Sequence, residues 1–227
     1  MKDIQNLQKT IGIQFNNETL LQQAFVHRSY LNENSSFELE SNERLEFLGD
    51  AVLELVVTEN LYNNFSNPEG ELTNWRAALV KGVKLAEIAQ DLNFDKYLLL
   101  SKGEAQGSQR ARQNILADCF EAFIGALYLD QGYEGAKKFI LENLVPDLSK
   151  ILKEKTYRDA KSQFQEAIQD KFSITPEYRV LEETGPDHAK HFVVGAYVNS
   201  ELYGTGEGNS KQEAQQEAAS EGLKNLK

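Results

Sequence analysis

Apolar residues recur every three or four positions through the first two thirds of the chain, which is the period of an amphipathic helix. Four stretches have this pattern and predict helices: Asn42–Asn63, Leu72–Leu92, Asn114–Asp130 and Gly135–Leu152. Three polar stretches predict breaks between helices: Asn32–Ser41, Ser66–Gly70 and Ser101–Gln113. We therefore expect a compact, mainly α domain over residues 1–153.

The pattern changes after a short polar segment, residues 154–158, which we interpret as a linker. A helical stretch, Ser162–Lys171, is followed by three short runs rich in β-branched and aromatic residues: Tyr178–Leu181, His191–Val198 and Glu201–Gly204. Ser210 then precedes an alanine-rich helix that runs to Leu226. Residues 159–227 are thus expected to form a small α+β domain in the order α-β-β-β-α.

Composition narrows the class of protein. Hydrophobic residues make up 41% of the 227 positions, enough to bury a sizeable core. No apolar run is long enough to span a membrane, and the first six residues are mostly polar and include Asp3, unlike a secretory signal. Cys119 is the only cysteine, which excludes an intramolecular disulfide and a cysteine-based zinc site. We expect a cytoplasmic protein with no membrane partner.

The net charge of −11 argues against a polyanionic partner. Residues 1–150 carry 14 Lys and Arg against 22 Asp and Glu, and residues 151–227 carry 10 against 13. If the partner is a nucleic acid, basic residues must gather on one face, and metal ions must offset an acidic site.

Two predicted helices each carry acids one turn apart. Glu43, Glu46 and Asp50 have spacings of three and four, which place them on one side of their helix. Asp118 and Glu121 share one side of a second helix that is otherwise nearly all apolar. Carboxylates in such a helix are costly to bury unless something positive satisfies them.

Two kinds of partner could satisfy these acids. Each acid alone could pair with Arg44, Arg76 or Lys81, or cap a neighbouring helix. Acids at one-turn spacing on two helices favour a divalent cation instead. Magnesium suits them because it prefers oxygen ligands and keeps several waters, so a few carboxylates suffice.

The motifs around these acids resemble the bacterial ribonuclease III family. Asn42–Leu53, NERLEFLGDAVL, is similar to that family's signature, and three further segments support the match: His27–Tyr30, Arg76–Val80 and Ile115–Ala122. The tail, from Asp159 to Ala219, resembles a double-stranded-RNA-binding domain. Two other interpretations stay open, a non-catalytic double-stranded-RNA-binding dimer and an unrelated helical scaffold.

The resemblance implies a homodimeric endonuclease that hydrolyses double-stranded RNA, including ribosomal precursors, to 5′-phosphate and 3′-hydroxyl ends with short 3′ overhangs. It implies two Mg²⁺ ions per active site, with Mn²⁺ as an alternative ion. The metal ligands by resemblance are Glu46, Asp118 and Glu121, and Asp50 and Glu121 are tied most directly to catalysis. Two further acids match positions around the cleft and at the dimer interface: Glu43 and Glu69.

The tail domain would read the shape of duplex RNA, since the deep major groove hides the base edges. By resemblance, Gln165 and Glu166 contact 2′-hydroxyls in one minor groove and His188 reaches the next. Ser210 and Lys211, at the start of the last helix, meet phosphates between them.

The last helix departs from the family pattern. Where the family has two adjacent lysines, this chain has Lys211 followed by Gln212. Glu213 and Glu217 add acid to the same helix, which predicts weaker RNA binding. Three other residues in the first domain are expected to be structural, by packing, capping or filling the core: His27, Trp75 and Cys119.

Overall fold

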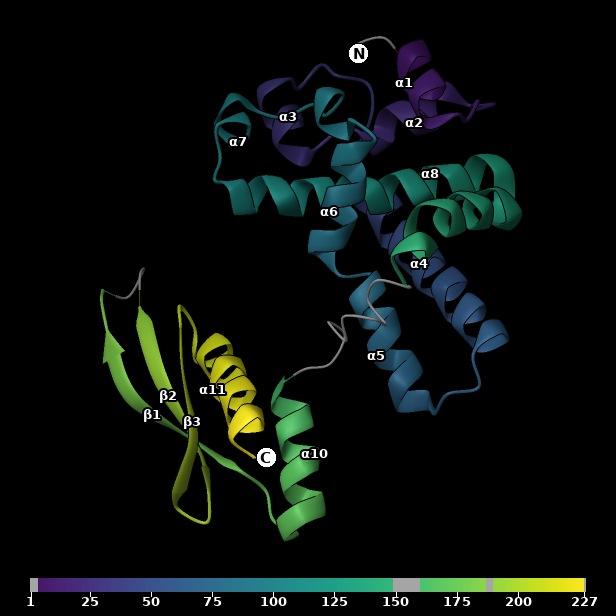
Figure 1. Ribbon diagram of the computed structural model, residues 1–227. Coiled ribbons are helices and arrows are strands. Elements are labelled where there is room, and N and C mark those ends of the chain that lie inside the picture. The colour runs from purple at the N-terminus through teal and green to yellow at the C-terminus, as the bar shows by residue number, and fades with distance from the viewer. Residues whose placement is uncertain (1–3, 149–159, 187–189, 227) are drawn as a thin grey trace. The chain divides into compact units, whose positions relative to one another are not determined.

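The computed structural model describes residues 4–148, 160–186 and 190–226. The chain forms two compact units, Met1–Glu154 and Lys155–Lys227 (Figure 1). We call them the first and second unit. The expected linker at 154–158 lies outside the described residues.

The first unit is helical. Its elements are α1 (Ile4–Ile11), α2 (Glu18–Ala24), α3 (Arg28–Glu33), α4 (Glu43–Asn64), α5 (Glu69–Leu79), α6 (Gly82–Asp91), the 3-10 turn η1 (Phe94–Lys96), α7 (Lys102–Ala105), α8 (Gln109–Leu144) and the 3-10 turn η2 (Val145–Asp147). The long helix α8 runs through the middle of the unit, with α2, α4 and α6 packed around it (Figure 1).

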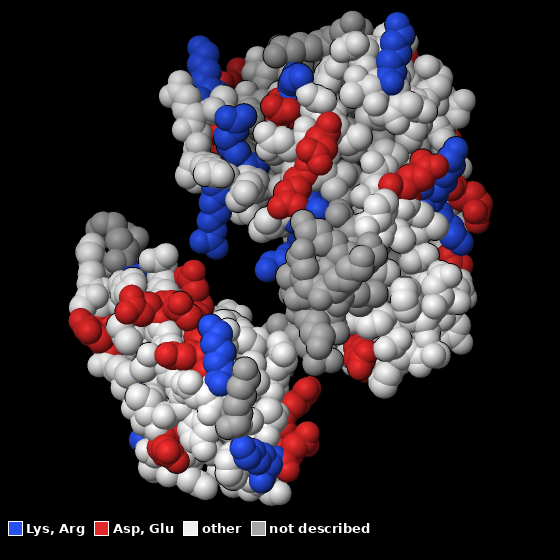
Figure 2. Space-filling model, in the orientation of Figure 1, with Lys and Arg blue, Asp and Glu red and all other residues white. Residues whose placement is uncertain are grey.

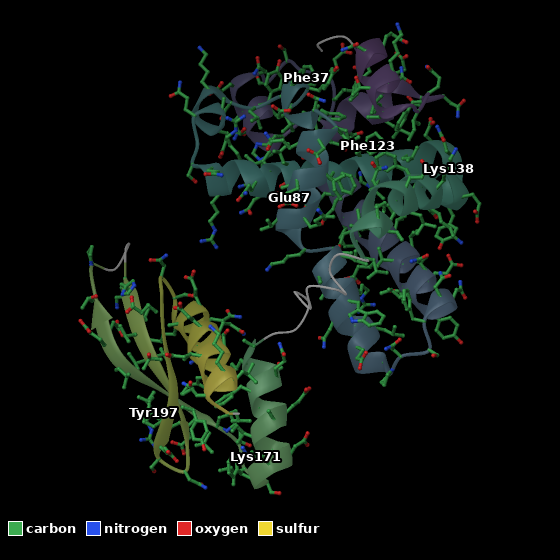
Figure 3. The ribbon with its side chains drawn as sticks, in the orientation of Figure 1. Phe37, Glu87, Phe123, Lys138, Lys171 and Tyr197 are labelled. Carbon is green, nitrogen blue, oxygen red and sulfur yellow. The ribbon has the colours of Figure 1, made fainter. Side chains whose placement is uncertain are left out.

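Aromatic rings fill the centre of the first unit around α8. Phe123 is fully buried and points into this core (Figure 3). Its ring lies 5.2 Å from that of Phe94 and 5.0 Å from that of Phe139. This core holds α8 in place, and the acids of the predicted site lie on that helix. None of the described helices is long and apolar enough to cross a membrane.

One expected helix is wrong, and one expected break between helices is confirmed. The stretch Leu72–Leu92 is not one helix, because α5 ends at Leu79 and Lys81 is extended, with ψ 130°. This break turns the chain so that the apolar face of α6 packs on α8. The break expected between Asn114–Asp130 and Gly135–Leu152 is confirmed. Element α8 spans both stretches, but its backbone is non-helical at Gly132 (φ 73°, ψ −172°), so it consists of two helical segments that meet at a kink. Residues 149–152 lie outside the described residues.

The polar stretch expected as a break at Ser101–Gln113 contains helix. Ser101 accepts a hydrogen bond from the backbone of Glu104 and begins α7, and Ser108 accepts one from Ala111 and begins α8. Both serines are N-caps, which favour a helix start in a polar sequence. Because this stretch is polar throughout, the sequence pattern did not predict these two helix starts.

The second unit has the expected α-β-β-β-α order. It consists of α10 (Ala160–Phe172), β1 (Glu177–Thr184), β2 (His191–Val198), β3 (Glu201–Gly208) and α11 (Lys211–Asn225). The strands form an antiparallel sheet in the order β1-β2-β3, with α10 and α11 on one side of it (Figure 1). Phe164 and Val194 are fully buried between the helices and the sheet.

A row of α11 side chains covers the outer edge of β3. Glu217 accepts a hydrogen bond from the backbone N–H of Glu207 at 2.7 Å, and Glu221 accepts one from the N–H of Thr205. Further along the row, Asn225 donates to the carbonyl of Tyr203 at 2.8 Å. Residues four apart on a helix share one face, so one stripe of α11 serves the whole edge.

Candidate metal centre and nucleic-acid interface

The two acid-bearing helices, α4 and α8, touch backbone to backbone at two glycines. A Cβ on Gly49 would lie 1.8 Å from the carbonyl oxygen of Glu121, and one on Gly125 would lie 2.1 Å from that of Leu45. No real Cβ tolerates such contacts, so only glycine fits at either position. This close crossing brings the acids of the two helices together.

Three carboxylates converge at the crossing. Glu46 from α4 and Asp118 and Glu121 from α8 each offer one oxygen, and these oxygens all lie within 4.8 Å of one another. All three side chains are partly buried. These are the residues that the family resemblance assigns to the metal site, and an all-oxygen set of this size suits a hard divalent cation.

Two of the three basic residues considered as alternative partners have partners elsewhere. Arg44 pairs with Glu40 at 3.8 Å, and Arg76 donates to the hydroxyl of Thr58 at 3.0 Å. No ion pair among the described residues includes Glu46, Asp118 or Glu121. The His27 ring lies near enough to Asp118 to oppose the rise in its pKa. The acids therefore face one another without a cation of the protein between them.

Crowding of negative charge changes the protonation of this cluster. Burial raises the pKa of Glu121 to about 8, and the charges of Asp50, Asp118 and Glu46 add to the effect. Burial is also the largest cause of the raised pKa of Asp118 and of Glu46. A bound cation would favour the ionised forms and reverse these shifts.

The other acids of the predicted site lie around this cluster. Asp50, one turn after Glu46, is exposed, and its charge contributes to the raised pKa of Glu121. Glu43 pairs with Arg28 at 3.4 Å. Glu69 begins α5 and accepts a hydrogen bond from the Thr73 hydroxyl at 2.9 Å, outside the three-carboxylate cluster.

The residues expected to be structural have structural contacts. The ring of His27 caps α3 by accepting from the N–H of Ser29, and burial is the main cause of its lowered pKa. Cys119 is fully buried, with its sulfur 3.5 Å from the carbonyl of Ala24. Trp75 is buried and packs edge-on against Phe65. All three expectations are confirmed.

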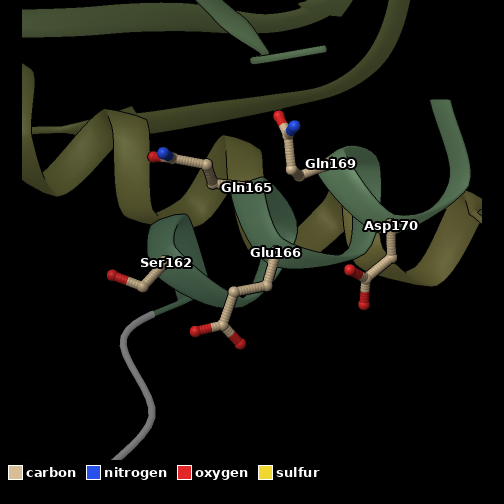
Figure 4. Close-up of a pocket in the computed structure, with 5 residues that line it drawn as sticks. All are labelled: Ser162, Gln165, Glu166, Gln169 and Asp170. Carbon is tan, nitrogen blue, oxygen red and sulfur yellow. The ribbon is translucent and has the colours of Figure 1, made fainter. Parts of the chain in front are cut away.

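In the second unit, the predicted RNA contacts on α10 lie in the open. Gln165 and Glu166 line a shallow hollow of about 580 Å³, with further polar side chains beside them (Figure 4): Ser162, Gln169 and Asp170. The two glutamines project to one side of the helix, and the serine and the two acids to the other. Such a polar strip can exchange hydrogen bonds with 2′-hydroxyls.

At the start of α11, Ser210 caps the helix and accepts from the N–H of Glu213 at 3.2 Å. Lys211 is 57% exposed, and its ammonium lies 3.7 Å from Glu183. Glu213 and Glu217 turn to backbone N–H groups of Asn209 and β3. They therefore serve the fold of this unit. His188 lies outside the described residues.

Among the described residues, the face of the molecule shown in Figure 2 has no uniformly basic patch. On the face shown in Figure 2, acidic and basic side chains of the described residues are interspersed over both units. On this face, recognition of an anion would rest on local groups, such as Lys211 at the start of α11 or cations bound by the acids.

Residues 17–148 match the family described as Ribonuclease-III-like, and residues 160–226 match the double-stranded RNA binding motif. The chain belongs to the ribonuclease III family. It is 48% identical over 223 residues to Ribonuclease 3 of Enterococcus faecalis, covering 97% of this chain and 96% of that relative. It is 46% identical over 225 residues to Ribonuclease 3 of Oceanobacillus iheyensis, covering 99% and 98%.

Solved structures agree for the first unit. The nuclease domain of ribonuclease III from Campylobacter jejuni has a TM-score of 0.58 at 39% identity, covering 65% of this chain and 97% of that chain. A second structure of that domain is described as showing structural flexibility in a region involved in dimer formation. It has a TM-score of 0.56 at 38% identity, covering 63% of this chain and 99% of that chain.

Membership of the ribonuclease III family makes this chain a metal-dependent endoribonuclease for double-stranded RNA, with a double-stranded-RNA-binding motif in its second unit. The interpretation as an unrelated scaffold is therefore wrong. Sequence reasoning missed the role of Gly49 and Gly125, although a glycine in mid-helix beside Asp50 was a signal of close packing. It also missed Gln169, which lies one turn after Gln165.

Proposed function

We propose that Glu46, Asp118 and Glu121 bind Mg²⁺, with two ions per active site and Mn²⁺ as an alternative ion. The observation that carries this proposal is the set of three carboxylate oxygens within 4.8 Å of one another and without a protein cation. When bound, such ions activate water and stabilise the leaving oxygen in an in-line displacement at phosphorus.

The protein's own residues have distinct tasks in this proposal. Glu121 lies among the other acids, so it is the central ligand, and Glu46 and Asp118 fix the spacing on either side. Asp50 is exposed at the rim and accepts a hydrogen bond from the attacking water, which orients it. Water adds to phosphorus and the bond from phosphorus to the 3′-oxygen breaks. One product therefore ends in a 5′-phosphate and the other in a 3′-hydroxyl.

A homodimer would supply one site for each strand. Three large apolar side chains of α4 are exposed: Phe47 by 82%, Tyr62 by 77% and Leu55 by 57%. At 100° per residue they share one face of the helix, next to Asp50. A second copy covering this stripe would bury them and bring the two active sites to the dimer seam. Staggered cuts with short 3′ overhangs, two nucleotides by family resemblance, would follow.

A hollow of about 460 Å³ opens beside this stripe, between α4 and α5. Tyr62, Leu72 and Arg76 line it, together with Glu69. We infer that this hollow receives side chains of the second copy, which would put Glu69 at the dimer interface, as the family resemblance implies.

RNA binding by the second unit would use both minor-groove and phosphate contacts. Gln165 and Glu166 would meet 2′-hydroxyls in one minor groove, and His188 would reach the next. Ser210 and Lys211 would meet the intervening phosphates. We further propose that the enzyme processes ribosomal and other precursor RNAs in the cytoplasm.

The test is cleavage of a perfect RNA duplex in Mg²⁺ and in EDTA, with both product ends sequenced. We expect cleavage only with the metal, and 3′ overhangs with 5′-phosphates. A heterodimer with one Glu121→Gln subunit should nick a single strand. Blunt ends or 2′,3′-cyclic phosphates would refute the paired-site hydrolysis proposed here.

A further inference from the structure

Lys211 lies close to a second lysine, Lys190, which is distant from it in the sequence. Lys190 precedes β2, and its ammonium lies 2.7 Å from one oxygen of Glu183 in β1. The ammonium of Lys211, at the start of α11, lies 3.7 Å from the other oxygen of Glu183. One carboxylate therefore holds two lysines from separate elements side by side.

The surroundings keep this pair at the surface in a defined position. Lys211 lies over the ring of Phe192, with 5.5 Å from its ammonium to the ring centroid, and Phe192 is itself buried in β2. The side chains of Lys190 and Lys211 are 36% and 57% exposed. Two ammonium groups share one carboxylate at this corner, in a chain of net charge −11.

The pair of Lys190 and Lys211 also bears on the departure from the family pattern at position 212. The ribonuclease III family has a second lysine directly after the position of Lys211, and this chain has Gln212. We propose that Lys190 is a second phosphate-binding cation of the RNA-binding unit and takes the place of the lysine missing at 212. Glu183 aligns the two lysines in the free protein, and the RNA phosphates take its place on binding.

This inference rests on duplex RNA binding by the second unit. The contribution of Lys190 to RNA affinity can be expressed as a change in salt dependence. Each lysine that neutralises a phosphate contributes about 0.9 to the slope of log affinity against log salt. Lys190→Ala should therefore make this slope shallower by roughly one or slightly less. It should weaken binding to all duplex sequences alike, on the order of five-fold at moderate salt, since a phosphate contact carries no base information.

The experiment measures binding of the full chain to a perfect RNA duplex of about 20 base pairs, a length that exceeds one binding site. EDTA prevents cleavage, and affinity is measured over a range of salt concentrations. Lys190→Ala is compared with Lys211→Ala. The matched control is Lys224→Ala, which removes the same charge from an exposed position at the other end of α11.

We expect Lys190→Ala to lose about as much affinity as Lys211→Ala, and Lys224→Ala to bind like the wild type. Adding Gln212→Lys to Lys190→Ala should restore affinity and slope, because it returns a lysine to the same corner. Equal binding by Lys190→Ala and Lys224→Ala would overturn the proposal, and so would a double variant that stays weak. If the wild type itself does not bind the duplex, the RNA-binding assignment of the second unit fails first.

Discussion

Replacing Glu121 with Gln should stabilise the metal-free protein at alkaline pH and remove its response to Mg²⁺. The pKa of Glu121 in the folded, metal-free protein is raised from 4.5 to about 8. A raised carboxyl pKa gives a stability contribution that is fully present below pH 4.5 and lost as the pH rises through 8. The wild type should therefore lose stability over this window, and Glu121→Gln should not.

The size of the effect follows from the pKa. A rise from 4.5 to about 8 corresponds to an upper limit of about 5 kcal/mol. Glu121 is only partly buried, so solvent screening reduces this to about 2 kcal/mol. For a unit of this size, 2 kcal/mol corresponds to a difference in Tm of roughly 4–8 °C at pH 8.5. At pH 5 the two proteins should melt within a degree or two of each other.

The assay is thermal unfolding followed by tryptophan fluorescence in EDTA at pH 5 and pH 8.5. Trp75 is the only tryptophan and lies buried in the first unit, so it reports on that unit. Added Mg²⁺ should raise the Tm of the wild type and have little effect on Glu121→Gln, because a ligand is lost. Glu54→Gln, at an exposed position of α4, is the control for net charge. Equal melting of wild type and Glu121→Gln in EDTA at pH 8.5 would refute the reasoning.

Three further outcomes are expected. Gly125→Ala should destabilise the first unit by about 3 kcal/mol and abolish stabilisation by Mg²⁺ in a melting assay, whereas Gly70→Ala, whose Cβ meets nothing within 4 Å, should do neither. A fragment ending at Lys155 should remain a folded helical dimer by circular dichroism and sedimentation, and its cleavage of duplex RNA should fall steeply with salt. Glu221→Ala should lower the hydrogen-exchange protection of the Thr205 amide and destabilise the second unit by about 1 kcal/mol; unchanged protection would contradict the bond described.

The acids of the active site could be predicted because helical spacing is local information. Glu46 and Asp50, like Asp118 and Glu121, share a helix face by sequence separation alone. The meeting of the two faces could not be derived in this way. It depends on the contact of Gly49 with the backbone of α8, which is a tertiary feature. The family resemblance supplied the grouping of the acids that spacing alone left open.

Helix boundaries were harder to predict, because tertiary packing overrides the apolar period. Both stretches around Lys81 have the apolar period of one helix, yet the chain turns there to lay α6 on α8. At Gly132 the predicted break is correct, because the non-helical backbone of this glycine separates the two helical segments of α8. The meaning of Glu213 and Glu217 was equally hidden, because their partners are backbone groups around β3 that no sequence pattern specifies.

The two edge strands of the sheet in the second unit, β1 and β3, are protected in different ways from pairing with a strand of another molecule. The ladder between β1 and β2 shifts register between Val180 and Glu182, and such a bulge discourages another strand from joining β1. Along β3, Glu217 and Glu221 already occupy the amides that a joining strand would need, and their negative charges repel the same edge of a neighbouring molecule. The acidic row on α11 should therefore keep neighbouring copies from joining sheet to sheet, even where several of them bind close together on one long duplex.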